Sequence, residues 1–357
     1  MAYEEVIIYY HTGTGNALTT ARWIAARTEG KSIKCTVQSI DYNYRPELPA
    51  NCGKLFIGFI YPTHGFNSSP AMLKFVWNFP RRKNTDVFLM NTRAGGKFFK
   101  LFTPGASGIA LWINMLILFL KGFRVVGARP VDLPSNWISV HPGLPPRWVA
   151  DLHERCSGIV NNFTDKVLSG KKQFLRAIVD IPIDTVLAPI AAMYYLIGRF
   201  FLAKTFIYTN RCNDCKICEK HCPVGAIIIK NGKPFWTHKC ESCMRCIDIC
   251  PTKSIQSSHL IFLIGVLLYF PLMETYSAAA YIYSQTGFFL FGNELFAFFF
   301  DSYLVLLFVF LLYMVIQPML RNKYFERLMR YTSLTYYWRR YLSPDVKIRD
   351  FRSKIQQ

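Results

Sequence analysis

Apolar runs and helical patterns alternate along the first 165 residues of the chain. Five runs rich in Val, Ile and Phe predict buried strands: Val6–Tyr10, Ile33–Ser39, Lys54–Ile60, Asp86–Asn91 and Phe123–Val131. Apolar residues recur at helical spacing in the intervening and following segments: Asn16–Arg27, Ser69–Phe79, Gly105–Lys121 and Asp151–Val167. This alternation predicts an α/β fold, in which helices cover both faces of a doubly wound parallel sheet.

The pattern changes after residue 165. Ser169–Lys172 interrupts the alternation, and Thr185–Gly198 is then uncharged for 14 residues. Because a membrane span needs about 20 apolar residues, we expect residues 166–209 to form a helical connector that faces the membrane in part and does not cross it.

A second apolar region covers residues 258–320. Its uncharged runs, Leu260–Met273 and Ser302–Leu320, are 14 and 19 residues long. They predict a hairpin of two transmembrane helices, at about 259–281 and about 297–320. The alternative is a buried helical hairpin in the core of a soluble protein.

The charges around this region predict its orientation. Lys253 precedes the first predicted span, Arg321 and Lys323 follow the second, and the loop between the spans has neither Lys nor Arg. By the positive-inside rule, the chain is then a multi-pass protein of the cytoplasmic (inner) membrane with both termini in the cytoplasm. Glu274 is either a proton or substrate site in the first span or an interfacial residue near its outer end.

Composition also favours contact with lipid. Of the 357 residues, 52% are hydrophobic and only 18% are charged, and the formal net charge is +20. Enough apolar material for a core excludes intrinsic disorder. The basic charge suits an anionic membrane surface or nucleic acid. Because the basic residues of 321–357 follow a predicted span directly, we expect a cytoplasmic interfacial tail on membrane lipid and no nucleic-acid partner.

Eight of the 11 cysteines fall within 39 residues and form a repeated motif, C-x2-C-x2-C-x3-C-P. This spacing is typical of proteins that bind [4Fe–4S] clusters through thiolates. Structural zinc, the alternative, prefers paired C-x2-C units with His and four ligands per metal. No secretory signal is recognisable before Val6, so we expect the cysteines in the reducing cytoplasm. The predicted metal ligands are Cys212, Cys215, Cys218, Cys222, Cys240, Cys243, Cys246 and Cys250.

Residues 211–256 resemble bacterial two-cluster ferredoxins, in which the fourth cysteine of each motif ligates the other cluster. The resemblance implies one [4Fe–4S] cluster on Cys212, Cys215, Cys218 and Cys250, and another on Cys240, Cys243, Cys246 and Cys222. The segment departs from the family in charge, with eight Lys or Arg against four Asp or Glu, where such ferredoxins are usually acidic. Its partner surface is therefore expected to be acidic or an anionic membrane.

A glycine-containing turn connects the first predicted strand to a helix, with the sequence Thr12-Gly13-Thr14-Gly15-Asn16-Ala17. Its small residues let backbone N–H groups converge on an anion, and the helix N-terminus favours negative charge. The turn lacks the Lys of a Walker loop and the G-x-G-x-x-G spacing. It resembles the FMN phosphate loop of flavodoxins, with Ala17 in place of the final Thr. The adjacent His11 is expected to be structural.

Two further loops fit the flavodoxin resemblance. Both follow predicted strands, so they would lie at the carboxyl edge of a sheet of order 2-1-3-4-5, where FMN binds. The implied FMN-binding residues are Thr12, Gly13, Thr14, Gly15, Asn16 and Ala17; Thr63, His64, Gly65 and Phe66; and Asn91, Thr92, Arg93, Ala94, Gly95 and Gly96. Phe66 or His64 would flank the isoalloxazine ring. The alternative is a vestigial fold without flavin, and no catalytic residue is predicted.

Residues 5–256 as a whole resemble the prokaryotic flavodoxin–ferredoxin fusion proteins, to which the apolar hairpin is an addition. The resemblance implies an FMN-binding flavodoxin-like domain at 1–165 and a two-cluster α+β ferredoxin domain at 210–257. With the connector, the hairpin at 258–320 and the tail at 321–357, the chain divides into five parts.

These motifs predict a membrane-anchored electron-transfer protein. Electrons would pass between FMN and the clusters and on to a membrane-associated acceptor, either a membrane-bound redox enzyme or a quinone or lipid, and a soluble electron donor is another candidate partner. The alternative is a membrane oxidoreductase that reduces a quinone or lipid directly, so the sequence leaves open whether the chain is an enzyme or a carrier. A redox sensor is a third hypothesis, for which no output domain is recognisable. The oligomeric state is not predicted.

Overall fold

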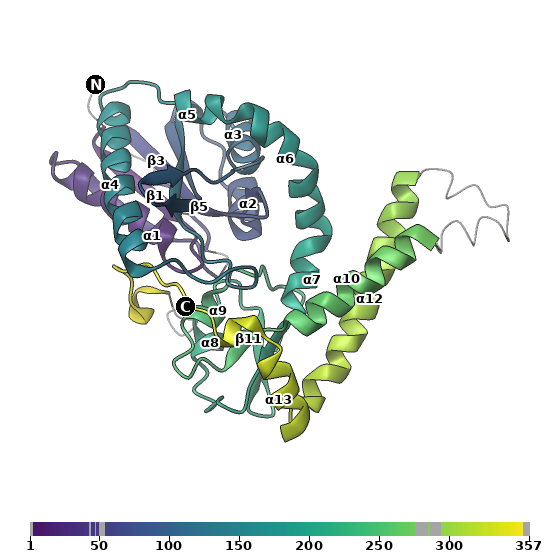
Figure 1. Cartoon of the computed structure of the whole chain (residues 1–357). Helices are drawn as coiled ribbons and strands as arrows, with labels where there is room; N and C mark the ends of the chain where they lie inside the picture. The colour runs from purple at the N-terminus through teal and green to yellow at the C-terminus, as the bar shows by residue number, and fades with distance from the viewer. Residues whose placement is uncertain are drawn as a thin grey trace.

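The structure is a computed structural model that describes residues 3–42, 44–46, 48–49, 54–275, 285 and 294–352. An α/β unit, a helical connector, a cysteine-rich unit, a pair of apolar helices and a C-terminal segment follow one another along the chain (Figure 1). The C-terminal segment returns to the α/β unit, so the first and last parts of the described chain lie side by side.

A mostly parallel sheet forms the centre of the α/β unit. Its parallel strands are β1 (Glu5–Tyr10), β2 (Lys34–Ser39), β3 (Leu55–His64), β5 (Asp86–Phe98) and β7 (Arg124–Pro134). They are hydrogen bonded in the order β2-β1-β3-β5-β7. Counting parallel strands alone, this is the predicted 2-1-3-4-5 order of the flavodoxin-like fold.

Helices cover both faces of this sheet. On one face, α1 (Asn16–Glu29) and α4 (Pro146–Leu168) enclose a core with the inner side chains of β1 and β7. On the other, α2 (Pro70–Asn78) and α3 (Ala110–Leu120) enclose a second core (Figure 1). The predicted strands and helices of this region are confirmed. β3 and β5 run past their predicted ends. Their last residues pair with β4 (Asn67–Ser68) and β6 (Leu101–Thr103) in antiparallel hairpins, and the residues just before these continue the parallel pairing of the sheet.

The cysteine-rich unit repeats its backbone along with its sequence. It contains α8 (Ile217–Lys220) and α9 (Arg245–Asp248), the hairpin of β9 (Ile227–Lys230) and β10 (Lys233–Trp236), and the antiparallel pair β8 (Phe206–Tyr208) and β11 (Ile255–Ser257). Two residues after the first cysteine of each copy, Asp214 and Ser242 have φ angles of 57° and 53°. Four residues after it, Lys216 and Met244 have φ angles of 58° and 64°. The two copies are therefore related by a structural pseudo-symmetry.

The connector is longer and more regular than predicted. After α5 (Leu175–Val179) come α6 (Ile181–Met193), a π-helical turn η1 (Tyr194–Gly198) and α7 (Arg199–Ala203). Ile181–Ala203 is thus one helical stretch of 23 residues, long and apolar enough to cross a membrane. The prediction that this segment is too short to span was wrong, because the helix continues past the uncharged run at both ends and includes Asp184 and Arg199.

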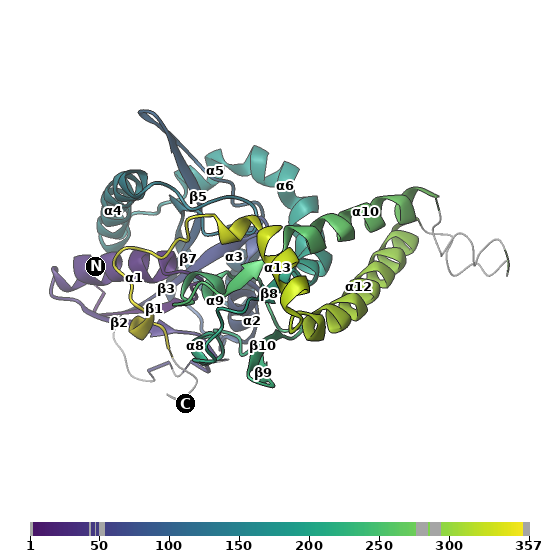
Figure 2. The ribbon, with the colours of Figure 1, turned by 60° about the horizontal axis from the view of Figure 1, so that its bottom comes forward.

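Two apolar helices, α10 (His259–Thr275) and α12 (Glu294–Met319), contact each other and project away from the rest of the chain (Figures 1 and 2). Phe298–Met319 is long and apolar enough to cross a membrane. Residues 276–281 of the first predicted span lie outside the described part of the chain, as does the loop that follows except Gln285.

The C-terminal segment departs from the predicted interfacial tail. After α13 (Lys323–Tyr331) and the short helix η3 (Leu334–Tyr336), the chain runs back to α1 and forms η4 (Ile348–Asp350). Val346 and Phe351 join the core of α1 and α4, with Leu342 packed against it. The expectation of an interfacial tail therefore does not describe residues 341–351. This stretch carries two basic and two acidic residues, so its charge gives no preference for an anionic surface, and its apolar side chains are buried instead.

Candidate cofactor sites

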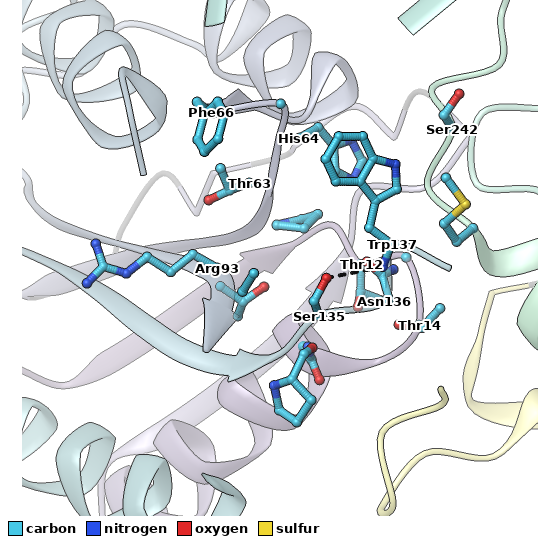
Figure 3. Close-up of a pocket in the computed structure, with 18 of the residues that line it drawn as sticks. Thr12, Thr14, Thr63, His64, Phe66, Arg93, Ser135, Asn136, Trp137 and Ser242 are labelled. Atoms are coloured by element: carbon cyan, nitrogen blue, oxygen red, sulfur yellow. Dashed lines mark hydrogen bonds between the residues drawn. The ribbon is translucent and has the colours of Figure 1, made fainter. Parts of the chain in front are cut away.

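A pocket opens at the carboxyl edge of the parallel sheet (Figure 3). It has about 800 Å³ of empty space, counting its open mouth. The loops that follow β1, β3, β5 and β7 contribute to it, as expected for an open α/β sheet. Eleven of the predicted FMN-binding residues line the pocket: Thr12, Gly13, Thr14, Asn16, Thr63, His64, Gly65, Phe66, Thr92, Arg93 and Ala94.

The other five predicted residues support the loops or lie elsewhere. The Gly15 N–H donates a 3.0 Å hydrogen bond to Thr12 Oγ1, which closes the first loop on itself. Asn91 Nδ2 donates to Thr63 Oγ1 at 2.6 Å and so holds the second loop against the third. Ala17 is in the first turn of α1 and its side chain is buried in the core, and Gly95 and Gly96 belong to β5 where it enters its hairpin with β6.

Several pocket residues were missed by sequence reasoning. Ser135, Asn136 and Trp137 follow β7, the fifth parallel strand, and line the pocket (Figure 3). The argument that placed the other loops at the carboxyl edge of the sheet applies to this loop too, so the sequence could have predicted it. Tyr194 of η1 and Met244 of the cysteine-rich unit also line the pocket. No local sequence signal could have predicted these two, because only the packing of distant segments brings them here.

The aromatic wall of the pocket comes partly from the connector. Gly65 has a φ of +53°, and a Cβ atom on it would lie 2.0 Å from the ring of Tyr194. The Tyr194 ring therefore lies directly against the Gly65 backbone, a contact that only glycine permits. Phe66 and His64 line the pocket as well, so four aromatic rings, with Trp137, surround the space in which a planar ligand would fit.

His64 offers the pocket an unpaired polar atom. Its side chain is buried, and its Nδ1 atom has no hydrogen-bond partner. Burial, with a smaller contribution from the nearby His11, lowers the pKa of His64 to about 3. The ring is therefore neutral near pH 7 and can pair with a polar group of a ligand. The loop after β1, the aromatic side chains and this nitrogen are the groups that would hold the phosphate and the ring of a flavin.

The cysteines lie in two groups in the structure. Cys212, Cys215, Cys218 and Cys250 line one small pocket of the cysteine-rich unit. The fourth cysteine of the first motif, Cys222, lies instead beside the second motif, where it interacts electrostatically with Cys240 and Cys243. Cys246 in turn interacts with Cys240 and Cys243. Each group therefore combines three cysteines of one motif with the last cysteine of the other.

Donors around the sulfur atoms also follow the pseudo-symmetry. The Ala226 N–H donates to Cys222 Sγ at 3.2 Å, and the Ser254 N–H donates to Cys250 Sγ at 3.3 Å. Trp236 Nε1 adds a contact to Cys246 Sγ at 3.5 Å. Hydrogen bonds to ligand sulfurs help to set the potential of an iron–sulfur cluster. Among the described residues, no three His, Cys, Asp or Glu side chains lie close enough together to hold a single metal ion. A [4Fe–4S] cubane is larger than one ion, so its four thiolate ligands lie further apart.

The two sites meet at Arg245, which lies between Cys243 and Cys246 and is 1% exposed. Its guanidinium donates to the carbonyl oxygens of Gly13, at 2.9 Å, and Thr12 in the first loop of the pocket. A Cβ atom on Gly13 would lie 2.5 Å from the Cys243 carbonyl oxygen, so only glycine allows this approach. The pocket and the second group of cysteines therefore share a wall.

A buried ionic cluster supports this wall. Arg245 Nη1 is 2.9 Å from a carboxylate oxygen of Asp41. Burial acts to raise the pKa of Asp41, but Arg245 and then His11 outweigh it, so this pKa lies below its ordinary value. His11 lies outside the pocket, with Nδ1 3.3 Å from Asp41 and Nε2 3.9 Å from Glu241 of the second motif. Its position fits the structural role expected for it.

Comparison with known proteins identifies one part of the chain. The family model of the 4Fe-4S dicluster domain matches residues 211–255. No curated protein matches the chain in sequence. Similar solved structures include flavodoxin 1 of Bacillus cereus, with 16% identity, a TM-score of 0.30 and coverage of 44% of this chain and 95% of that one. Flavodoxin 2 of Bacillus cereus has 17% identity, a TM-score of 0.31 and coverage of 45% and 99%.

A larger protein is also among the similar structures. The rubredoxin oxygen:oxidoreductase of Desulfovibrio gigas has 12% identity and a TM-score of 0.28, and the match covers 46% of this chain. The chain spans 37% of the length of that protein. The strand order and the dicluster match together define a flavodoxin-like unit joined to a [4Fe–4S] unit, an arrangement that indicates electron transfer.

Proposed function

We propose that this chain is a membrane-anchored electron-transfer protein that passes electrons between FMN and two [4Fe–4S] clusters and on to a membrane-associated acceptor. FMN would bind in the pocket at the sheet edge, and each of the two cysteine groups would hold one cluster. The observation that carries the proposal is the shared wall: Ser242 and Met244, the neighbours of Cys243, line the flavin pocket.

When bound, FMN exchanges one or two electrons and each cluster exchanges one. The residues of the chain fix the distance and the surroundings of these groups. Asn136 Nδ2 donates to the Cys243 carbonyl oxygen at 3.1 Å, so the loop after β7 is tied to the second cysteine motif. Arg245, whose charge is balanced by Asp41, donates to the loop after β1 and so holds the pocket against the second cysteine motif.

The membrane part of the proposal rests on the projecting helices α10 and α12, of which Phe298–Met319 is long and apolar enough to span. Trp112 Nε1 donates to Asp184 at 3.2 Å, and Tyr194 lies against Gly65, so Ile181–Ala203 is docked along the α/β unit. We therefore assign this helix to the membrane interface and the projecting pair α10 and α12 to the span. With both termini in the cytoplasm, the flavin pocket and the cysteines would lie on the cytoplasmic side. The five-part division of the chain predicted above is part of this proposal.

Cofactor content tests the proposal directly. The full chain would be purified anaerobically in mild detergent, and iron, sulfide and flavin would be measured in the same sample. We expect about eight Fe and about one FMN per chain, as two [4Fe–4S] clusters and one flavin require. Iron without flavin would refute the flavin part, and persistent zinc in place of iron would refute electron transfer altogether.

The acceptor would be examined with the same sample. Reduction of a short-chain quinone at a rate above that of the free cofactors would favour the alternative, an oxidoreductase that reduces a quinone or lipid directly. Transfer to a partner protein with no quinone reduction would favour the carrier.

A further inference from the structure

A second cavity, unused by the proposed cofactors, lies at the free edge of the sheet beside β7. Its empty space is about 610 Å³. Arg129 and Asp132 of β7, Arg155 of α4, Arg176 of α5 and Phe102 of β6 are among the residues that line it. Three of these five side chains are therefore arginines from three different elements.

One of these arginines has a buried donor atom without a hydrogen-bond partner. The Nε atom of Arg129 is buried and has no hydrogen-bond partner. Burial, followed by the charge of Arg176, lowers the pKa of Arg129. Arg155 lies over the ring of Phe102, with its guanidinium carbon 4.5 Å from the ring centroid. The unsatisfied Nε of Arg129 is a donor that an anion in the cavity would pair with, and the ring of Phe102 holds the Arg155 guanidinium at the cavity wall.

The acidic residues nearby do not balance this charge. Asp132, the carboxylate that lines the cavity, is already paired: Nε of Arg93, a residue of the first pocket, is 2.6 Å from it, and Nη1 of Arg93 is 2.6 Å from Asp180. Arg176 shares Asp180 at 3.1 Å. Among the residues that line the cavity, three arginines, Arg129, Arg155 and Arg176, thus face one aspartate, Asp132, and an excess of two positive charges remains. Arginine forks bind phosphate oxygens through paired N–H donors.

Exposed apolar side chains flank the cavity on two sides. On the hairpin of β5 and β6, Phe98, Phe99 and Leu101 are 65%, 79% and 68% exposed. On α5, Leu175 and Val179 are 78% and 56% exposed. Figure 2 shows the end of β5 projecting on the same side of the molecule as α5. Such large apolar side chains in water are unusual for a soluble surface and suit the acyl region of a lipid.

We infer that this cavity binds the phosphodiester headgroup of an anionic phospholipid, held by Arg129, Arg155 and Arg176, while the acyl chains run out past the hairpin and α5. Free phosphate shares the headgroup chemistry, but it would leave the apolar side chains at the rim uncovered. The inference depends on the proposed membrane association only for the source of the ligand, and it is independent of electron transfer.

Binding of short-chain lipids to the full-length holoprotein in neutral detergent tests the inference. Dihexanoyl phosphatidylglycerol, dihexanoyl phosphatidylcholine and inorganic phosphate would be titrated separately by calorimetry. We expect phosphatidylglycerol to bind at least about tenfold more tightly than the other two, and Arg129→Gln to weaken its binding by about tenfold. Arg124→Gln removes an exposed arginine from the same strand and is the matched control, with unchanged binding.

The possible outcomes distinguish a lipid from free phosphate and this cavity from other binding sites. Equal binding of phosphatidylglycerol and phosphatidylcholine would overturn the role of the arginines in selecting an anionic headgroup. Phosphate binding as tight as phosphatidylglycerol binding would overturn the assignment of a lipid as the ligand. Unchanged binding in Arg129→Gln would overturn the site. Iron and flavin contents equal to those of the parent protein show that the variant is folded. If Arg129→Gln does not fold, the same binding measurement is made with Arg176→Gln. Loss of lipid binding with full cofactor content would leave the proposed function standing.

Discussion

The guanidinium of Arg245 donates a 2.9 Å hydrogen bond to the carbonyl oxygen of Gly13. The two residues are 232 positions apart in the chain, and each belongs to a different candidate cofactor site. The contact fixes the cysteine loop against the loop that follows β1. Any cofactor in the pocket is thereby held next to the second group of cysteines, an arrangement that neither unit could provide alone.

Replacement of Arg245 tests this junction. Arg245→Gln leaves Asp41 buried without its positive partner and weakens the link to Gly13. Removing one member of a buried ion pair costs about 3–5 kcal/mol, so we expect a marked drop in the thermal midpoint and a lower flavin content after purification. The double variant Asp41→Asn with Arg245→Gln removes both charges and should recover part of the midpoint. A midpoint unchanged in the single variant would contradict a structural role for the pair.

The contact between Gly65 and Tyr194 predicts a local effect on the pocket. Gly65→Ala places a methyl group where the Tyr194 ring now lies, and we expect this ring to be displaced and flavin binding to weaken at least about tenfold, by loss of the aromatic wall. Flavin retention would be measured by equilibrium dialysis of the purified protein.

Gly170→Ala is the matched control for backbone strain. Gly170 has a φ of +83° and nothing within 4 Å of an added Cβ atom, so this variant has the strain of a left-handed residue without the clash. If Gly65→Ala and Gly170→Ala retained flavin equally, the clash with Tyr194 would have no role. Adding Tyr194→Ala to Gly65→Ala should relieve the clash while leaving the wall incomplete.

If the fourth cysteine of each motif binds the cluster of the other motif, replacing that cysteine should remove the cluster of the other motif. Cys250→Ser should affect the same cluster as Cys215→Ser, because both cysteines line one pocket. Cys222→Ser should match Cys240→Ser instead. Electron paramagnetic resonance of the reduced proteins would show which signal each variant loses. Cys156→Ser, at a buried cysteine outside the motifs, should retain both signals. Loss of one signal by Cys222→Ser and Cys215→Ser alike would contradict the crossed arrangement.

The neutral His64 predicts a loss of stability in acid. Its pKa is about 3 in the folded protein and about 6.5 when exposed in the unfolded chain. Below pH 6.5 the unfolded state therefore takes up a proton that the folded state does not, and the free energy of unfolding falls as the pH drops from about 6.5 toward 3. The contribution is intact above pH 6.5.

Thermal midpoints measured anaerobically between pH 7.5 and 5 would show this slope. His64→Gln has no group that titrates in this range at that position, so its midpoint should fall less steeply than that of the parent protein. Acid lability of iron–sulfur clusters affects both proteins alike, and the difference between the two slopes reports His64. Parallel slopes would show that His64 is accessible to protons in the folded state.

Where the sequence fell short, long-range packing was responsible. The loops after β1, β3 and β5 were found because each follows a strongly apolar strand, and strand order places their ends together. The connector was misjudged because a window of uncharged residues ignores a helix that continues through Asp184 and Arg199. Tyr194 reaches the pocket from a π-helical turn that no periodicity reveals. The packing of Val346 and Phe351 in the first core was not predicted, because residues 321–357 are rich in Lys and Arg and these two apolar residues show no periodicity.

The sequence alone determined the parallel α/β unit, the repeated cysteine motif and the apolar helices, because periodicity and ligand spacing are local properties of a chain. Only the tertiary structure decided which segments share a wall. The contacts of Arg245 with Gly13 and of Tyr194 with Gly65 depend on shape complementarity between distant surfaces, and the unsatisfied Nε of Arg129 is visible only once its neighbours are in place. Burial and close packing are properties of the whole fold, so the junction between the two candidate sites could be read only from the folded chain.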